Sequence, residues 1–339
     1  MILLKTNKNE SWQFFYEPNR GICQRRGNHI PQLLYPDGCE DFDANCDEQG
    51  RIHIIATNAD RDLVYFVHDG HNWQQHTLLK SRGSAVAGQF RLLPVGRWQN
   101  LFYTLMLEDR TLLVHHIIDA PTSPAVLDCV EGSFACALSD HDSIALLYKK
   151  KEGLFTREYQ WNQKQWSEPV GLSQQGEIAD CICLPDGTLG TLTYSPDTIF
   201  FHGKESLVIE AETALPPCLA YVDGILWIVW EEEGRIRACR SEDDGAHFDA
   251  PTRFLTSAPI QRFSVRPTRF PHATCNFALG SVGALSVIGK RFSEPFPTPA
   301  ELRRMGQEVE ELAENDELFA LRAEIARLKK ELEKTANHP

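Results

Sequence analysis

The sequence lacks the long apolar runs and basic clusters that would place a protein in a membrane or on nucleic acid. None of its hydrophobic segments approaches the roughly 20 residues needed to cross a bilayer. Ile2-Leu3-Leu4 is followed at once by polar residues, so no secretory signal is visible and we expect a cytoplasmic protein. The 339 residues carry a formal net charge of -13, and the best basic cluster is Arg25-Arg26, which argues against nucleic-acid binding.

The sequence also lacks the short motifs of nucleotide, metal and nucleophile chemistry. It contains no GxGxxG, P-loop, HExxH or GxSxG string. Its ten cysteines include no CxxC pair, and Cys181-x-Cys183, the closest pair, would need two further ligands to hold zinc. We therefore expect no cofactor, no metal and no catalytic residue, and we interpret the cysteines as reduced thiols that pack as small hydrophobic side chains.

Short strands at regular spacing are what the sequence has in abundance. The clearest unit runs from Asp41 to Leu79, where FDANCD, RIHIIAT, LVYFVH and WQQHTLL read as strands separated by turns rich in Gly, Asp and Asn. Four short strands joined by such turns form one blade of a β-propeller. The hydrophobic content of 42%, with 18 Phe and 7 Trp, is sufficient for the large core of such a fold.

Repetition of this unit predicts an all-β propeller of four-stranded blades. Seven units follow one another at a period of roughly 40 to 45 residues, and the last, fainter unit runs from Gln261 to Phe292. We favour seven blades, with six as the alternative, because the N-terminal strand could instead complete the last blade. The first strand of many units carries small residues that suit the crowded axis of a propeller, among them Ala44, Cys46, Ala87, Ala135, Cys136, Ala179, Cys181, Cys218 and Ala220.

One turn is more specific than the general rhythm. The segment from Ser241 to Phe248 reads SEDDGAHF, which fits the pattern S-x-D-x-G-x-x-[W/F]. The side chains of Ser241 and Asp243 can bond turn backbone groups, Gly245 permits a positive φ, and Phe248 can anchor the turn. This segment resembles the Asp box of sialidase-type propellers, which joins the third and fourth strands of a blade.

The resemblance implies a fold and not an activity, because Asp boxes are structural and lie away from the sialidase active site. Sialidases carry an Arg-Ile-Pro motif near their start, whose arginine helps to hold the substrate carboxylate. The nearest string here is His29-Ile30-Pro31, and neutral imidazole cannot replace the guanidinium group. This departure argues against sialidase catalysis and favours a role without turnover.

The C-terminal part of the chain changes in character. We divide the chain into a propeller over 1–293, a Pro-rich linker over 294–299 and a helical segment over 300–335. A narrow apolar stripe with charged flanks predicts a coiled coil through which the chain self-associates. The alternative is that this helix docks on its own propeller. The stripe consists of Leu318, Leu321, Ile325, Leu328 and Leu332.

Three hypotheses about function follow from these features. The first is a non-enzymatic interaction module that presents a propeller face to a protein or glycan and multiplies its copies through the C-terminal helix. The second is a glycan-binding propeller or a diverged glycosidase. The third is a structural subunit of a larger assembly.

Overall fold

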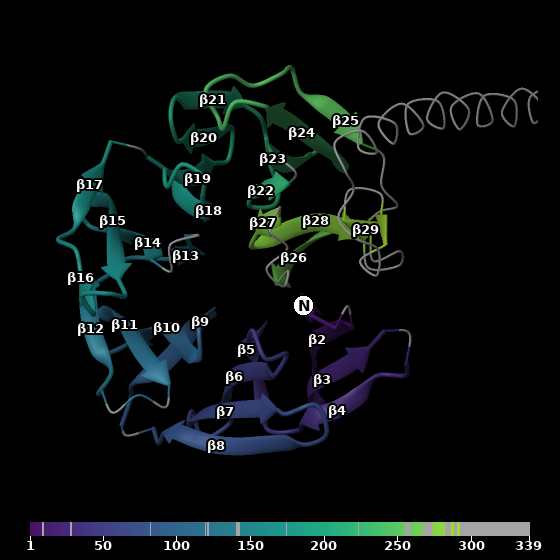
Figure 1. Cartoon of the computed structure of the whole chain (residues 1–339), viewed down its shortest axis with the longest axis vertical. Helices are drawn as coiled ribbons and strands as arrows, with labels where there is room; N and C mark the ends of the chain where they lie inside the picture. The colour runs from purple at the N-terminus through teal and green to yellow at the C-terminus, as the bar shows by residue number, and fades with distance from the viewer. Residues whose placement is uncertain are drawn as a thin grey trace, which may run out of the picture.

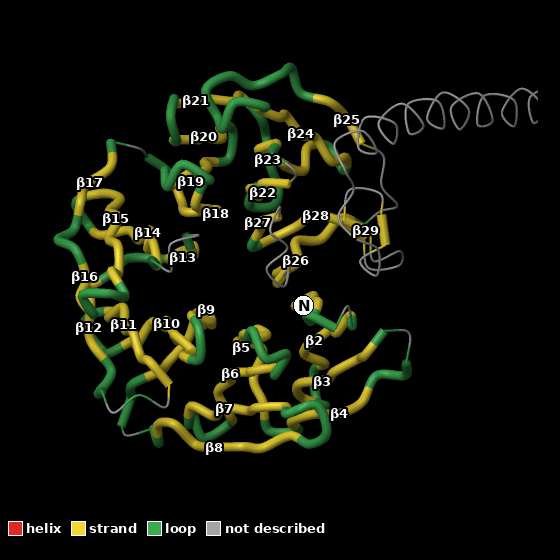
Figure 2. The backbone as a smooth tube through the Cα atoms, in the orientation of Figure 1, coloured by secondary structure: helices red, strands yellow, loops and turns green. Residues whose placement is uncertain are grey.

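The computed structural model describes residues 1–291 except for 9, 28, 82, 119, 121, 140–142, 174, 223, 255–258, 267–272, 282–285 and 288–289. These residues form thirty strands, and within them Figure 2 shows strands and loops but no helix. In this part of the chain, no segment has the helical length and apolarity that crossing a bilayer demands.

The first sheet joins the two ends of the described chain. In spatial order its eight strands are β30 (Lys290–Arg291), β29 (Ser286–Val287), β28 (Phe277–Ser281), β26 (Ile260–Arg266), β1 (Ile2–Lys5), β2 (Ser11–Glu17), β3 (Gly21–Arg26) and β4 (Gln32–Tyr35). Its neighbouring strands are antiparallel except for β1 and β26, which run parallel with Ile2 opposite Ser264.

The second and third sheets each consist of four consecutive antiparallel strands. The second contains β5 (Gly38–Cys46), β6 (Ile52–Asn58), β7 (Leu63–His68) and β8 (Trp73–Leu79). The third contains β9 (Val86–Val95), β10 (Trp98–Met106), β11 (Thr111–Ile118) and β12 (Ala125–Cys129).

The remaining three sheets follow the same plan, with one additional strand in the fourth and one in the sixth. The fourth contains β13 (Phe134–Leu138), β14 (Ile144–Lys150), β15 (Gly153–Gln160), β16 (Gln165–Trp166) and β17 (Val170–Leu172). The fifth contains β18 (Glu177–Cys183), β19 (Leu189–Ser195), β20 (Thr198–His202) and β21 (Ser206–Glu210). The sixth contains β22 (Cys218–Val222), β23 (Ile225–Glu232), β24 (Arg235–Ser241), β25 (Thr252–Phe254) and, beside β22, β27 (Ala273–Cys275).

The sheets stand around one central axis. Figure 1 shows them in chain order around the ring, with β5, β9, β13, β18, β22 and β26 nearest the centre and the N-terminus close to β26. This arrangement confirms the prediction of an all-β propeller. The unit predicted over Asp41 to Leu79 is the second sheet, with its four strands in the expected order.

The described strands form six hydrogen-bonded sheets, which agrees with the alternative count of six and not with the preferred seven; the first sheet combines two runs of four antiparallel strands. The last unit is not a sheet of its own: β26 pairs with β1 through Ser264, Val265 and Arg266, and this pairing places β26 and β28 in the same sheet as the first four strands. The physical reason is closure of the ring, which brings two inner strands within pairing distance.

Hydrophobic side chains fill the spaces between neighbouring sheets. One buried cluster joins Phe14 and Ile22 of the first sheet to Ile54 and Phe66 of the second. Another joins sheets five and six and contains Trp230. A four-stranded sheet has too little apolar surface to be stable alone, so each sheet depends on both of its neighbours. This packing fixes the inner strands, and with them the side chains that face the axis.

Candidate functional site

Charged side chains from distant parts of the sequence meet near the axis. Asp41 and Asp43 lie on β5, Arg91 on β9, and Arg262 and Arg266 on β26. We call these five residues, together with Asp180 of β18, Gln89 of β9 and Phe277 of β28, the axial cluster. Sequence analysis missed this cluster, because its members come from separate repeats and each one resembles an ordinary polar residue of a strand.

Asp43 is the structural centre of one half of the cluster. Arg266 donates from Nη2 to Asp43 Oδ1 at 2.8 Å, and the backbone N–H of Leu92 donates to Asp43 Oδ2 at 2.8 Å. Arg266 also donates from Nη1 to the carbonyl oxygen of Asn276 at 3.1 Å. Asp43 therefore connects its own sheet to the third sheet and to the sheet that closes the ring.

Asp180 has the same role in the other half of the cluster. It is fully buried and accepts hydrogen bonds from the backbone N–H of Leu219 at 3.0 Å and of Cys181 at 2.9 Å, and from the amide of Asn276 at 3.0 Å. Burial raises the pKa of Asp180, while the nearby Arg262 charge and these hydrogen bonds oppose that rise. Asp43 and Asp180 thus each accept an N–H from the inner strand of the next sheet.

Arg91 and Arg262 share one aromatic ring. Their guanidinium carbons lie 4.6 Å and 3.5 Å from the centroid of Phe277, which places both cations over that ring. Arg262 Nη2 also donates to the carbonyl oxygens of Ala179 and Pro217, at 2.5 and 3.4 Å. Both arginines are half-buried, and burial, together with the nearby Arg266 charge, lowers the pKa of Arg91.

Arg91 differs from Arg262 and Arg266 in its polar contacts. Its side chain makes no hydrogen bond or ion pair with the residues that the structure describes; it lies over the Phe277 ring and interacts with the Asp43 charge at longer range. A guanidinium group carries five N–H donors, which bind planar acceptors in pairs. Arg91 therefore offers unused donors at the axis.

Asp41 and Gln89 form the exposed rim of the axial cluster. The backbone N–H of Gln89 donates to Asp41 Oδ2 at 2.5 Å, and Gln89 Nε2 donates to the carbonyl oxygen of Gly132 at 3.3 Å. Gln89 has a φ of 53°, in the left-handed region that residues other than glycine seldom adopt. Although Asp41 is exposed, the surrounding protein partly desolvates its carboxyl group and raises its pKa, against the opposing effects of the Gln89 N–H and the Arg91 charge.

The chemistry available in the axial cluster is binding by directed hydrogen bonds and charge. The cysteines near the axis are poor nucleophiles, because burial raises the pKa of Cys136 and of Cys181 well above that of a free thiol. Within the described residues, no group of three or more His, Cys, Asp or Glu side chains is placed to hold a metal ion.

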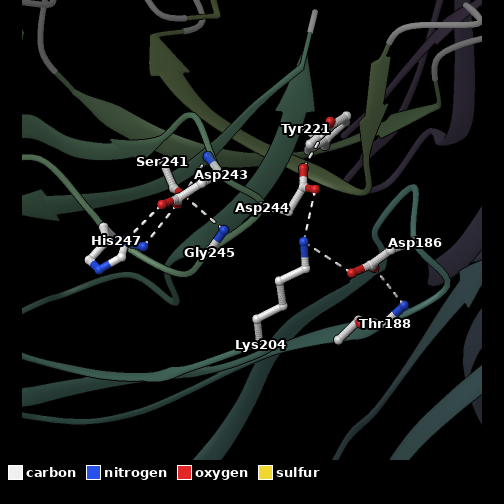
Figure 3. A network of polar contacts seen from close by, with 9 residues as sticks. All are labelled: Asp186, Thr188, Lys204, Tyr221, Ser241, Asp243, Asp244, Gly245 and His247. Atoms are coloured by element: carbon white, nitrogen blue, oxygen red, sulfur yellow. Dashed lines mark hydrogen bonds and ion pairs between the residues drawn. The ribbon is translucent and has the colours of Figure 1, made fainter.

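The turn that resembles an Asp box lies between the two outer strands of the sixth sheet, β24 and β25. Figure 3 shows the side chains of Ser241 and Asp243 directed toward Gly245 and His247 of the same turn. The N–H of Gly245 donates to Ser241 Oγ at 2.8 Å, the Ser241 hydroxyl donates to Asp243 Oδ1 at 2.7 Å, and the N–H of His247 donates to the same oxygen at 2.9 Å. The ring of Phe248 meets Phe201 of the fifth sheet edge to face, with centroids 5.3 Å apart.

The same turn is tied to the fifth sheet by charge. Lys204 Nζ lies 3.1 Å from Asp244 Oδ2 and 3.2 Å from Asp186 Oδ2, so one lysine joins two turns of its own sheet to the turn of the next (Figure 3). The Tyr221 hydroxyl donates to Asp244 Oδ1 at 3.1 Å. The contacts with the fifth sheet are made by Asp244 and Phe248, while Ser241, Asp243 and Gly245 bond within the turn itself.

The predicted helix interface lies outside the described residues. This applies to Leu318, Leu321, Ile325, Leu328 and Leu332 and to the linker over 294–299.

Comparison with known proteins extends the description of the fold. The sequence matches no protein-family model and no curated protein sequence. Among solved structures, an ulvan lyase, a polysaccharide lyase bound to -[GlcA(1-4)Rha3S]-, is 10% identical, with a TM-score of 0.56 over 89% of this chain and 94% of the lyase. At that identity the likeness shows the fold alone.

Two lectins are similar at a lower level. The fucose-specific lectin of Aleuria aurantia is 13% identical, with a TM-score of 0.46 over 76% of this chain and 95% of the lectin. SapL1 lectin, in complex with alpha methyl fucoside, is 11% identical, with a TM-score of 0.44 over 76% of this chain and 96% of the lectin.

Proposed function

We propose that this protein is a carbohydrate-binding propeller whose ligand lies at the rim of the axial cluster. The observation that carries the proposal is the placement of Gln89 and Asp41. Gln89 is exposed and held at a positive φ, and its N–H fixes the carboxylate of Asp41 on the neighbouring inner strand. Strain of this kind is concentrated at functional sites, where the surrounding structure imposes it.

The side chains at this rim suit a saccharide. Carboxylate, amide and guanidinium groups are planar and bind hydroxyl groups in pairs, and binding sites generally combine a few such groups with an aromatic surface. Asp41, Gln89 and Arg91 supply the polar groups, and the buried ring of Phe277 supports the guanidinium groups from beneath. The shared fold of a lyase that binds a polysaccharide is in keeping with this proposal.

The carboxylates of this site favour binding of a carbohydrate without turnover. Glycosidases generally need two carboxyl groups on either side of the scissile bond. β5 carries three carboxylates: Glu40 and Asp41 are exposed, and Asp43 is buried and paired with Arg266. Asp41, which accepts the Gln89 N–H, can orient a sugar, while Asp43 is held in its ion pair and is not free to act as the second carboxyl group.

The experiment compares two variants in a binding assay against a panel of soluble polysaccharides. Asp41→Asn removes the charge at the rim, and Gln89→Gly removes the side chain while the backbone keeps its positive φ. We expect at least tenfold weaker binding for both variants, and we expect Gln89→Gly to be as stable as the wild type or more stable, since glycine relieves the strain. Asp109→Asn, in an exposed turn, is the control and retains full affinity.

A panel on which no polysaccharide binds the wild type refutes the proposal. So does wild-type affinity in both rim variants, because the ligand would then lie elsewhere. Release of reducing ends or unsaturated sugars that is lost in Asp41→Asn would show turnover in place of simple binding.

We further propose that the chain self-associates through the helical stripe from Leu318 to Leu332, which would raise avidity for a repetitive ligand. The proposal rests on the 3-4 spacing of the apolar residues between charged flanks. Leu321→Glu with Leu328→Glu should convert an oligomer to a monomer in mass measurements on the full chain. Ala323→Glu, on the opposite side of the predicted helix, should leave the mass unchanged. A monomeric wild type contradicts this proposal.

A further inference from the structure

We infer that the ligand at the axial cluster carries an anionic group, a carboxylate or a sulfate ester, and that Arg91 receives it. This inference rests on the proposed carbohydrate binding and names the class of carbohydrate. A neutral sugar would be satisfied by the amide and carboxylate at the rim, whereas Arg91 adds a cation whose donors the described protein leaves unused.

The three carboxylates of the axial cluster already have hydrogen-bond partners in the protein. Asp43 is paired with Arg266, and Asp180 accepts two backbone N–H groups and the Asn276 amide. Asp41 accepts the N–H of Gln89. The carboxylates of the cluster are thus already engaged in hydrogen bonds, and none of them is within ion-pair distance of Arg91 in the described part of the chain.

Arg91 lies near other charged groups of the cluster. Burial and the positive charges of Arg266 and Arg262 lower the pKa of Arg91, and the Asp43 charge acts in the opposite direction. Arg266 is paired with Asp43, and Arg262 donates to two carbonyl oxygens, so Arg91 is the guanidinium of the cluster whose donors are left for a ligand. A planar or tetrahedral oxyanion can accept two parallel N–H bonds from one guanidinium.

The Phe277 ring fixes the orientation of the Arg91 guanidinium group. Arg91 and Arg262 both lie over Phe277, so one ring limits the positions of two guanidinium groups. Arg262 is fixed further by two carbonyl acceptors, while its Nε has no hydrogen-bond partner within the described structure. A pre-positioned guanidinium loses less entropy on binding than a free side chain, which favours Arg91 as the residue that receives the anion.

The test uses the full chain and two matched pairs of oligosaccharides in calorimetric titrations. One pair is an oligoglucuronate and its carboxyl-reduced neutral form, and the other is a sulfated oligosaccharide and its desulfated form. We expect each charged member that binds to do so at least tenfold more tightly than its neutral counterpart. Comparison of the two pairs distinguishes carboxylate from sulfate as the preferred group.

The variants Arg91→Gln and Arg91→Lys identify the receiving residue. We expect Arg91→Gln to lose at least tenfold of the affinity for the charged member and much less of the affinity for the neutral member, so that the preference for the charged member disappears. Arg91→Lys keeps the charge but loses the paired N–H donors of the guanidinium group, so its affinity for the charged member should lie between those of the wild type and Arg91→Gln. Arg97→Gln is the matched control: this exposed arginine lies six positions further along the chain, over Trp98, and should retain wild-type affinity.

The outcomes separate this inference from the proposed function. Equal affinity for the charged and neutral members overturns the inference and leaves carbohydrate binding intact, whereas no binding of any member overturns both. If Arg91→Gln does not fold, competition on the wild type replaces it. Free glucuronate or inorganic sulfate should then displace the bound charged oligosaccharide, and glucose should not. Displacement by all of them to the same extent overturns the inference.

Discussion

Arg266 and Asp43 form a buried ion pair between residues 223 positions apart in the sequence. The N–O distance is 2.8 Å, and the two side chains are 6% and 1% exposed. Arg266 ends β26, which pairs with β1, while Asp43 lies on the inner strand of the second sheet. Closure of the propeller therefore includes a charged contact at the axis as well as the main-chain pairing between β26 and β1.

Breaking this pair from one side should be strongly destabilising. Arg266→Met leaves the Asp43 carboxylate buried without its cation, and the cost of such an uncompensated charge is about 3–5 kcal/mol of unfolding free energy. Asp43→Asn keeps an acceptor for the Leu92 N–H, and the double variant should lose less than the sum of the two single losses. Urea unfolding of the four proteins measures this coupling.

The exposed pair Arg20 and Glu17 provides the control, because Arg20→Met removes an ion pair that water already screens. We expect no loss beyond the error of the unfolding measurement, because water screens the exposed pair. A loss for Arg266→Met as small as that for Arg20→Met would show that the axial pair does not hold the ring closed.

The elements that sequence analysis predicted well depend on local pattern. The strands between Asp41 and Leu79 alternate with turn residues, and each pairs with the next strand in the chain, so local reading was sufficient. The hydrogen bonds that Ser241 and Asp243 make within the turn from Ser241 to Phe248 are also local, since each spans at most four residues. The spacing of Ser241, Asp243 and Gly245 therefore carries the information for this turn.

The number of sheets and the axial cluster depend on contacts that no local pattern records. The parallel pairing of Ile2 with Ser264 makes one sheet of the first and last units, and it forms only when the ring closes. Arg91 and Phe277 likewise meet because β9 and β28 both face the axis. When polar and apolar residues alternate along a strand, the sequence of that strand alone does not indicate which aromatic ring its arginine will contact.

The turn from Ser241 to Phe248 should respond to pH and to the loss of its serine. The hydrogen bonds from Ser241 and His247 hold the pKa of Asp243 well below its usual value. A carboxyl group whose pKa is lower in the folded state adds stability above its unfolded pKa, and this contribution is lost as pH falls through the folded value. Wild-type stability should therefore fall more steeply below pH about 4 than that of Asp243→Asn.

Ser241→Ala removes the acceptor of a buried backbone group. The N–H of Gly245 would have no partner, which costs about 1–3 kcal/mol at neutral pH. Glu242→Ala, at the exposed neighbouring position, is the matched control and should change stability by less than about 0.5 kcal/mol. Equal effects of Ser241→Ala and Glu242→Ala on the urea midpoint would contradict this account of the turn.

Two glycines with nearly the same backbone angle should differ in their tolerance of a side chain. Gly21 has a φ of 98° and Gly70 a φ of 100°, so alanine is strained at both. A Cβ at Gly21 would lie 2.6 Å from the carbonyl oxygen of Pro36 and would also overlap that of Tyr35, whereas a Cβ at Gly70 meets nothing within 4 Å.

Gly70→Ala should therefore lose about 1 kcal/mol of unfolding free energy, from backbone strain alone. Gly21→Ala adds a steric overlap with backbone atoms and should lose more than about 3 kcal/mol. Thermal unfolding of the two variants beside the wild type measures the difference. Similar losses for both would show that the turn at Gly21 can move away from the added methyl group.

The ten cysteines should fall into three classes of reactivity, set by burial. None of the ten forms a disulfide bond; Cys129 is exposed, and Cys39 and Cys183 are half-buried. Burial raises the pKa of Cys218 to about 11 and that of Cys46, Cys239 and Cys275 to about 12. Because the thiolate is the reactive species, these buried thiols should be inert in the folded protein at pH about 8.

A thiol-exchange reagent such as dithionitrobenzoate should therefore show one fast equivalent, at most two slower ones, and the rest only after unfolding. Cys129→Ser should abolish the fast phase and leave the unfolding midpoint unchanged, because its side chain is exposed on the outer strand β12. Cys181→Ser, which places a hydroxyl at a buried axial position, should leave the fast phase intact and lower the midpoint. More than three thiols reacting without unfolding would mean that the inner strands open to solvent far more often than their packing implies.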